Sequence, residues 1–179
     1  MKNSSLRLVV MALALLLLVT AVGGCKKDNS APPPADKSSE TVTLYFSDNQ
    51  AMSLTPEDRV VKVEKPVNPE KLAAAVLSGL IAGPENKDMQ KTIPPEARLL
   101  GVNIKDGIAY ADFSNELKSK HWGGSSGESM TVYSIVNSLT ELPEIKKVQI
   151  LIAGKEIETL AGHLDTSQPL ERNQEMIKK

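Results

Sequence analysis

The chain has 179 residues, with 21 Lys or Arg against 22 Asp or Glu and a formal net charge of -1. This near balance argues against a nucleic-acid-binding protein, which normally needs a strongly basic domain or patch, and the length suits one domain of ordinary size. The single cysteine excludes an internal disulfide, and the small number of aromatic residues, six, argues weakly against a carbohydrate or ring-stacking cleft.

The first 24 residues have the pattern of an export signal. Lys2 and Arg7 form a basic start, residues 8–21 are uncharged and apolar, and small residues follow up to Cys25. This succession is typical of a signal peptide, and the apolar stretch is short for a membrane span. Without residues 1–24 the chain keeps 19 basic and 22 acidic residues, so its formal charge becomes -3.

The sequence VGGC, which ends at Cys25, resembles a bacterial lipobox. In such signals the thiol takes a diacylglycerol and the chain is cut just before the cysteine, so we expect lipidation at Cys25. Two acyl chains give stable membrane anchoring, whereas one gives only marginal binding. We therefore expect a lipid-anchored protein on the extracytoplasmic face of the cell membrane. The alternative is a plain secretory signal with an incidental cysteine.

Composition divides the rest of the chain into three parts. After Cys25 the sequence KKDNSAPPPADKSSE is polar and Pro-rich, cannot form a core, and predicts a tether over residues 25–40. We expect a folded domain over residues 41–173 and a polar tail over residues 174–179. Residues 171–179 are charged, and we expect no core role for them.

Two strands and a helix are expected first. Residues 41–46 and 59–63 are rich in β-branched and apolar side chains, which favours strands. Asn68-Pro69 combines a capping residue with a proline suited to the first helical turn. Apolar residues then repeat at helical spacing as far as Ile81, and Gly83-Pro84 ends the helix.

A β-hairpin is expected next, because residues 99–104 and 108–113 flank Asp106-Gly107, a turn pair typical of hairpins. The second helix is expected to begin at a capping box, since Ser125 and Glu128 have the required spacing. In that motif the Ser125 hydroxyl accepts a hydrogen bond from the Glu128 amide, and the carboxylate reaches back toward the residue that caps the helix.

The second helix is expected to run to about Glu141. Residues 147–152 alternate in polarity and predict a central strand, and residues 157–160 predict a short last strand. The order β-β-α-β-β-α-β predicts an α+β fold, in which a mixed open sheet carries two helices on one face.

The sequence HWGGSSGES, which begins at His121, invites two functional interpretations. No lysine follows its glycines, so it is not a P-loop. A serine nucleophile at Ser125, Ser126 or Ser129 would need a base, and neither His121 nor His163 has an acidic partner at an obvious spacing. We prefer a capped helix start preceded by a flexible turn.

His121 and His163 could share a metal with Asp112 or Asp165. The sequence has no short His-x-x-His spacing and no second cysteine, so we expect no metal site and no cofactor. Solvated or capping histidines are the simpler interpretation.

Asp106, Asp112 and Glu116 form a loose acidic set, and paired carboxylates could serve glycoside hydrolysis. Asp106 belongs to a turn and Asp112 alternates outward on a strand, so a solvated surface explains both. The pair Lys146-Lys147 is too small for a nucleic-acid patch. We therefore expect no catalytic residues and no enzyme activity.

Several ordered strings of this sequence recur in one known family. They are TVTLYFSD from Thr41, VLSGLIAGP from Val76, IPP from Ile93, KDGIA from Lys105, DFS from Asp112, GE from Gly127, TVYSIVNSLTELPEIKKVQILIAGKEIETLAGHLD from Thr131, and PLERN from Pro169. Through these strings the region from about Thr41 to Asn173 resembles the GerMN domain, a family named for sporulation and spore-germination proteins. Its members are typically lipoproteins or otherwise exported, in agreement with Cys25.

The resemblance implies a non-catalytic assembly role in sporulation, germination or envelope complexes, and it carries over no catalytic residues. Similar domains are related to ring-building modules, so it also implies self-association or envelope protein partners. The sporulation member has two such domains, whereas this chain has one and no internal repeat. The positions that match the family strings have the physical character of turn, core and cap residues: Asp112, Phe113, Ser114, Gly127, Glu128 and Asn137.

Two classes of function stay open. The first is a membrane-tethered interaction module that uses exposed sheet edges as assembly surfaces. The second is a lipid-anchored cell-wall ligand-binding protein or hydrolase in which Gly123–Gly127 forms a cleft wall. A convergent cavity holding a strongly shifted carboxylate would favour the second class, and a flat surface would favour the first.

Overall fold

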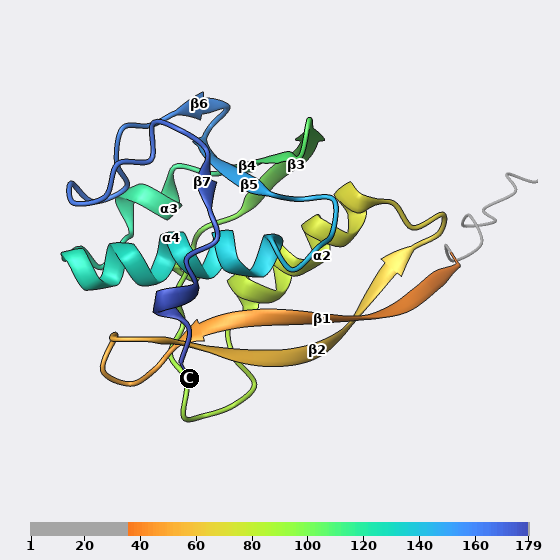
Figure 1. Cartoon of the computed structure of the whole chain (residues 1–179), viewed down its shortest axis with the longest axis horizontal. Coiled ribbons are helices and arrows are strands. Elements are labelled where there is room, and N and C mark those ends of the chain that lie inside the picture. Colours follow the sequence, from red (N-terminus) through yellow and green to blue (C-terminus); the bar gives the residue numbers. More distant parts are fainter. Residues whose placement is uncertain (1–35, 179) are drawn as a thin grey trace, which may run out of the picture. The chain divides into compact units, whose positions relative to one another are not determined.

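The computed structural model describes residues 36–178 (Figure 1). The expected signal peptide over residues 1–24 and the expected lipidation site Cys25 lie outside the described residues, as does most of the expected tether. Within the described part of the chain, no helix is both long and apolar enough to cross a bilayer.

Two helices form the middle layer of the domain, with a β-hairpin on one side and a larger sheet on the other (Figure 1). The helices are α2 (Pro69–Ala82) and α4 (Ser125–Leu139). The hairpin consists of β1 (Lys37–Ser47) and β2 (Leu54–Glu64), and the larger sheet is built on β3 (Leu99–Lys105), β4 (Ile108–Phe113) and β5 (Lys147–Ile152). The short elements of the described chain are α3 (Glu116–Ser119), β6 (Lys155–Glu156), β7 (Leu170–Glu171) and the 3-10 helix η1 (Gln174–Met176).

The larger sheet is mixed. Strand β4 pairs antiparallel with β3 and parallel with β5, while β6 and β7 both pair antiparallel with β5. The expected α+β fold, a mixed sheet with two helices packed on it, is therefore confirmed. Strands β1 and β2 do not join this sheet but pair with each other along their whole length.

Small polar residues on α4 help the hairpin to pack on the side of the helices that faces away from the larger sheet. The apolar residues of α4 at helical spacing are buried, namely Val132, Ile135, Val136 and Leu139. Thr131, Ser134 and Ser138 are buried as well. The Ser138 hydroxyl accepts a hydrogen bond from the Tyr45 amide of β1 at 3.0 Å, and the Ser134 hydroxyl lies 2.6 Å from that of Thr92. These short side chains bring two neighbouring segments close and satisfy their polar groups, so α4 is buried on two sides.

Three local predictions are confirmed. The Asn68 side chain caps α2 by accepting from the Lys71 amide at 2.8 Å, and Pro69 is the first helical residue. Gly83, with φ of 92°, ends the same helix. Asp106 and Gly107 both have positive φ, at 52° and 79°, as the expected two-residue hairpin turn requires.

The domain is longer at both ends than the sequence predicted. Strand β1 begins at Lys37, inside the expected tether, because its polar residues pair with the far end of β2, where Lys37 is opposite Glu64. The expectation that residues 171–179 have no core role is wrong. Ile177 packs against the cluster around the buried Leu54, and the Lys178 amide donates to the Leu54 carbonyl at 2.8 Å.

Gly79 marks the closest approach between α2 and the hairpin. A Cβ atom at this position would lie 2.8 Å from Leu44 Cδ1, and Leu44 is fully buried in the core. On an exposed helix surface valine is slightly more favourable than glycine, so any loss of stability from Gly79→Val reports the packing.

We expect Gly79→Val to lower the free energy of unfolding by about 1–3 kcal/mol through overpacking. Ser78→Val, at the exposed neighbouring position, is the matched control and is expected to stay within about 0.5 kcal/mol of the wild type. Urea unfolding of a fragment covering residues 36–179 measures both. Equal midpoints for Gly79→Val and the wild type would contradict the close approach.

Candidate functional site

Glu128 is the most deeply placed charged residue of the domain. It lies in the first turn of α4 and is fully buried. The expected capping box is wrong, because Gly124 occupies the N-cap position, no side chain makes a capping hydrogen bond, and Ser125 is an exposed first residue of the helix. The Glu128 carboxylate points instead to a segment more than thirty residues further along the chain.

Both oxygens of this carboxylate are occupied by donors from one loop. Oε1 accepts from the Thr159 hydroxyl at 2.6 Å and from the Leu160 and Ala161 amides at 2.9 and 2.7 Å. Oε2 accepts from the His163 and Leu164 amides at 2.8 and 3.2 Å. Burial raises the pKa of Glu128, but the hydrogen bonds outweigh it, those from Ala161 and Thr159 foremost, so the pKa lies below its ordinary value.

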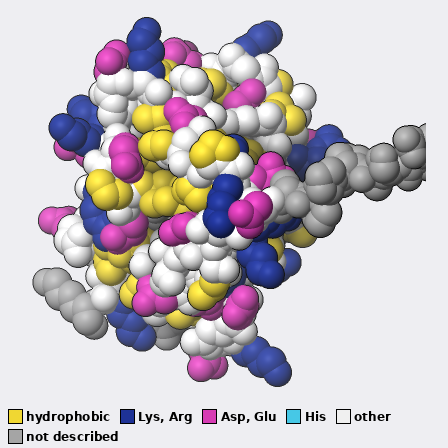
Figure 2. All heavy atoms as spheres, turned by 90° about the vertical axis from the view of Figure 1, so that its right-hand side faces the viewer, with side chains coloured by type: hydrophobic (Ala, Val, Ile, Leu, Met, Phe, Trp, Pro, Cys, Tyr) yellow, Lys and Arg dark blue, Asp and Glu magenta, His cyan; other side chains and the backbone are white. Residues whose placement is uncertain are grey.

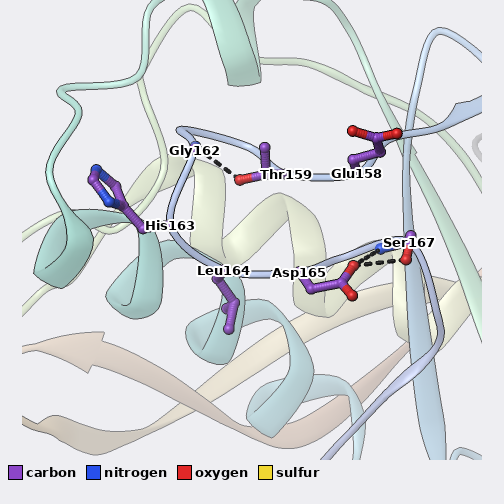
Figure 3. Close-up of a pocket in the computed structure, with 7 residues that line it drawn as sticks. All are labelled: Glu158, Thr159, Gly162, His163, Leu164, Asp165 and Ser167. Atoms are coloured by element: carbon purple, nitrogen blue, oxygen red, sulfur yellow. Dashed lines mark hydrogen bonds between the residues drawn. The ribbon is translucent and has the colours of Figure 1, made fainter.

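The loop held by Glu128 borders a cavity of about 430 Å³ (Figure 3). Its lining residues are Glu158, Thr159, Gly162, His163, Leu164, Asp165 and Ser167. Polar groups in this lining bond to one another, because the Ser167 amide and hydroxyl donate to Asp165 Oδ1 at 2.9 and 2.6 Å, and the Gly162 amide donates to the Thr159 hydroxyl at 2.8 Å. Figure 3 shows the His163 ring and the Asp165 carboxylate pointing away from each other, so the structure does not bring this pair together.

His121 belongs to a chain of hydrogen bonds. Its Nδ1 accepts from the Gly123 amide at 3.0 Å, so Nε2 carries the proton and donates to the Thr131 hydroxyl at 3.0 Å. That hydroxyl donates to the Thr92 carbonyl at 2.5 Å. Burial lowers the pKa of His121, against the opposing effects of the Glu128 charge and the Gly127 backbone. With both ring nitrogens engaged, His121 is not placed as a base for Ser125, Ser126 or Ser129.

The other candidate residues serve local structure. Asp112 Oδ1 accepts from the Gly154 amide at 2.8 Å and so fixes the turn after β5. A guanidinium nitrogen of Arg98 lies 3.9 Å from a Glu116 carboxylate oxygen, and the Lys147 ammonium lies 2.8 Å from a carboxylate oxygen of Glu171. In the part of the chain that the structure describes, no three His, Cys, Asp or Glu side chains come together as a metal site.

A second, smaller cavity of about 150 Å³ lies where the loop between β1 and β2 meets the start of α4. The Gly-rich loop that the sequence suggested as a cleft wall contributes Gly127 to it, and Trp122 lies beside that loop. The full lining is Ser47, Asp48, Asn49, Ala51, Gln90, Lys91, Thr92, Trp122, Gly127, Met130 and Thr131.

A clamp around Arg172 ties the C-terminal segment to the hairpin and to α4, and sequence reasoning missed it. One guanidinium nitrogen of Arg172 donates to the Tyr45 hydroxyl at 2.7 Å and to Glu141 Oε1 at 2.6 Å, and the guanidinium carbon lies 5.2 Å from the centre of the Tyr45 ring. Asn137 adds two bonds of 2.9 Å with the backbone of Asn173. The family string PLERN was the available signal for this contact.

Comparison with known proteins decides the family. Residues 43–158 match the Germane family, described as sporulation and spore germination. The chain belongs to the Germane family. No curated protein matches it.

Three solved structures share the Germane fold seen here. A Clostridium perfringens protein assigned as a lipoprotein is 27% identical, with a TM-score of 0.54 over 78% of this chain and 93% of that one. The first GerMN domain of the Bacillus subtilis sporulation protein GerM is 25% identical, with a TM-score of 0.53 over 76% and 98% of the two chains. The tandem GerMN domains of GerM are 22% identical, with a TM-score of 0.55 over 80% of this chain and 48% of that one. The last match shows the fold alone, over about half of the tandem protein.

Residues that match the Germane strings have the structural roles expected of turns, caps and core. Phe113 is fully buried, Asp112 fixes a turn, and the Ser114 hydroxyl accepts from the Arg98 amide at 3.0 Å. Glu128 differs from the expectation, because it holds a distant loop instead of its own helix end. Its carboxylate is shifted in pKa, but both oxygens are occupied within the protein.

The roles of Glu128 and Ser125 can be separated by substitution. We expect Glu128→Gln to lower the free energy of unfolding by about 1.5–3 kcal/mol. The glutamine side chain carries no charge, and its NH2 group would face backbone N–H donors without being able to accept from them. Ser125→Ala is expected to stay within about 0.5 kcal/mol of the wild type, since Ser125 makes no capping bond. Urea unfolding measures both losses. A larger loss in Ser125→Ala than in Glu128→Gln would support the capping box and contradict the loop anchor.

The Glu128 anchor also predicts a pH dependence. The folded-state pKa lies below the ordinary value of 4.5, so the stabilisation is complete above pH 4.5 and is lost as the pH falls through the folded-state pKa. We expect the difference in unfolding free energy between wild type and Glu128→Gln to be constant from pH 7 to about 5 and to shrink below pH 4.5. The remaining carboxylates are common to both proteins and cancel in the difference. A gap that stays constant down to pH 3 would contradict the lowered pKa.

Proposed function

We propose that this protein is a lipid-anchored lipoprotein on the extracytoplasmic face of the cell membrane, and that its GerMN domain is a non-catalytic assembly module for sporulation, germination or envelope complexes. The observation that carries the proposal is the family match over residues 43–158. The VGGC sequence ending at Cys25 supports the anchor, and so does the similarity to a protein assigned as a lipoprotein.

The geometry of the candidate residues supports a non-catalytic role. His121 uses both ring nitrogens within the protein, and the Glu128 carboxylate is enclosed by five donors. A general base or nucleophile needs a free atom that reaches substrate, and these groups are committed to holding loops.

Two surfaces suit assembly. Among residues 36–178, strand β3 has a neighbour on one side only, and Leu100 on this strand is 54% exposed, so a further strand could be added at this edge. Figure 2 shows apolar side chains gathered near the middle of the face at the right of Figure 1, with charged side chains around them. Apolar patches rimmed by polar residues are typical of interaction sites.

Lipid anchoring strengthens such contacts without adding new ones. Chains confined to one membrane plane meet at high effective concentration, so interfaces that are weak in solution can be populated. Self-association or partner binding therefore depends on lipidation at Cys25 or on a high protein concentration.

We expect Cys25→Ser to abolish fatty-acid labelling, to release the chain from membranes, and to remove crosslinks between neighbouring chains formed through a photoreactive residue at position 100. Metabolic labelling, membrane fractionation and crosslinking in cells measure these effects. The control is Cys25→Ser fused to an unrelated membrane-spanning anchor, which should restore crosslinks without the label. An unlabelled mutant that stays on the membrane would refute the anchor, and wild-type membranes without crosslinked neighbours or partners would refute the assembly role.

A further inference from the structure

The smaller cavity carries a feature that the assembly role does not use. Trp122, the only tryptophan of the chain, is 57% exposed and lines this cavity. Single exposed apolar side chains are common on protein surfaces, so only the residues around the Trp122 ring can indicate a site. The cavity defined by the lining given above is called the Trp122 cavity.

The walls of the Trp122 cavity are held by bonds within the protein. The Asp48 carboxylate fixes the loop between β1 and β2 by accepting from the Gln50 and Met52 amides at 3.1 and 3.0 Å and from the Ser53 hydroxyl at 2.7 Å. The backbone N–H of Gln90 donates to the Ser47 carbonyl at 2.8 Å, and this bond joins the opposite wall to β1. Preformed walls of this kind are typical of small-molecule sites.

The polar residues of the lining include two exposed side-chain amides, those of Asn49 and Gln90. Gln90 Nε2 donates to Asn49 Oδ1 at 2.7 Å. This bond leaves one amide nitrogen and one amide oxygen of the pair without a partner among residues 36–178. The result does not depend on which amide is the donor, because reversing both side chains again leaves one donor and one acceptor.

The lining also contains two charged side chains, Asp48 and Lys91. Both oxygens of Asp48 accept from the loop described above. The stem of Lys91 lies along Gly83, where an added Cβ atom would come within 2.8 Å of the Lys91 Cε atom. Besides Asp48 and Lys91, the lining offers a neutral donor and acceptor, an indole ring and the apolar side chains of Ala51 and Met130.

This combination matches an acetamido sugar. The free donor and acceptor of the Asn49–Gln90 pair are complementary to the C=O and N–H of an acetamido group, and its methyl group suits the apolar lining. The pyranose ring has an apolar face that can lie against the Trp122 indole. A volume of about 150 Å³ has room for the acetamido group and adjoining ring atoms but not for a long chain.

We infer that the Trp122 cavity binds one N-acetylhexosamine unit of a glycan strand. The few aromatic residues in the sequence argued against a ring-stacking cleft, but a single exposed tryptophan suffices when the acetamido group supplies the rest of the recognition. The inference does not depend on self-association, and a chain exported to the cell surface would meet such glycans there.

Because Trp122 is the only tryptophan of the chain, tryptophan fluorescence reports on binding at this cavity. The full-length protein in a polyoxyethylene detergent is titrated with chitotriose, a trimer of N-acetylglucosamine, and with cellotriose, the matching trimer without acetamido groups. We expect a saturable change in tryptophan emission with chitotriose and none with cellotriose. No change with chitotriose would overturn the proposal, and equal responses would overturn the role of the acetamido group.

Variants assign the binding to the cavity, measured by calorimetry with chitotriose. Asn49→Ala removes one hydrogen-bond partner and is expected to weaken binding about three- to tenfold. Trp122→Ala is expected to weaken binding at least as much. Val60→Ala removes an apolar side chain that is 66% exposed on β2 and should leave the affinity unchanged. Wild-type affinity in Trp122→Ala, or an equal loss in Val60→Ala, would place the binding elsewhere.

Discussion

The domain depends on a buried carboxylate that is balanced by hydrogen bonds. Removing an ionised side chain from water is costly unless its lone pairs are satisfied, and the Glu128 carboxylate is satisfied by four backbone amides and one hydroxyl. All five donors come from residues 159–164, so one charge in the first turn of α4 holds a loop that has little regular structure. That loop in turn borders the larger cavity and leads into the C-terminal segment.

A second constraint comes from the position of the helices between two sheets. A helix with one apolar stripe can cover only one sheet. Helix α4 packs on a second side because Ser138 bonds to the hairpin, and Thr131 and Ser134 bond to the segment around Thr92. Gly79 serves the same purpose on α2, where the helix comes close to Leu44. The Arg172 clamp then joins the hairpin, α4 and the chain end, so the two outer layers are linked through the helices and through the C-terminal segment.

Local signals predicted most of the elements, whereas contacts distant in sequence were not predictable. The cap at Asn68 and the turn at Asp106-Gly107 depend on residues within a few positions, and both are confirmed. The spacing of Ser125 and Glu128 fits a capping box equally well in sequence, but the loop donors lie more than thirty residues away and compete successfully for the carboxylate. Trp122 was visible as a residue but not as part of a cavity, because Asn49 and Gln90 reach it from segments far away in the chain. The lipid anchor at Cys25 remains a prediction, since it lies outside the described residues.

Hydrogen exchange measured residue by residue tests the Glu128 anchor most directly. The account predicts that the amides of Leu160, Ala161, His163 and Leu164 exchange slowly in the wild-type protein, although they belong to a loop. In Glu128→Gln these four amides should lose protection while the paired amides of β4 and β5 keep theirs. Fast exchange at the four positions in the wild type, or unchanged protection in Glu128→Gln, would contradict the account.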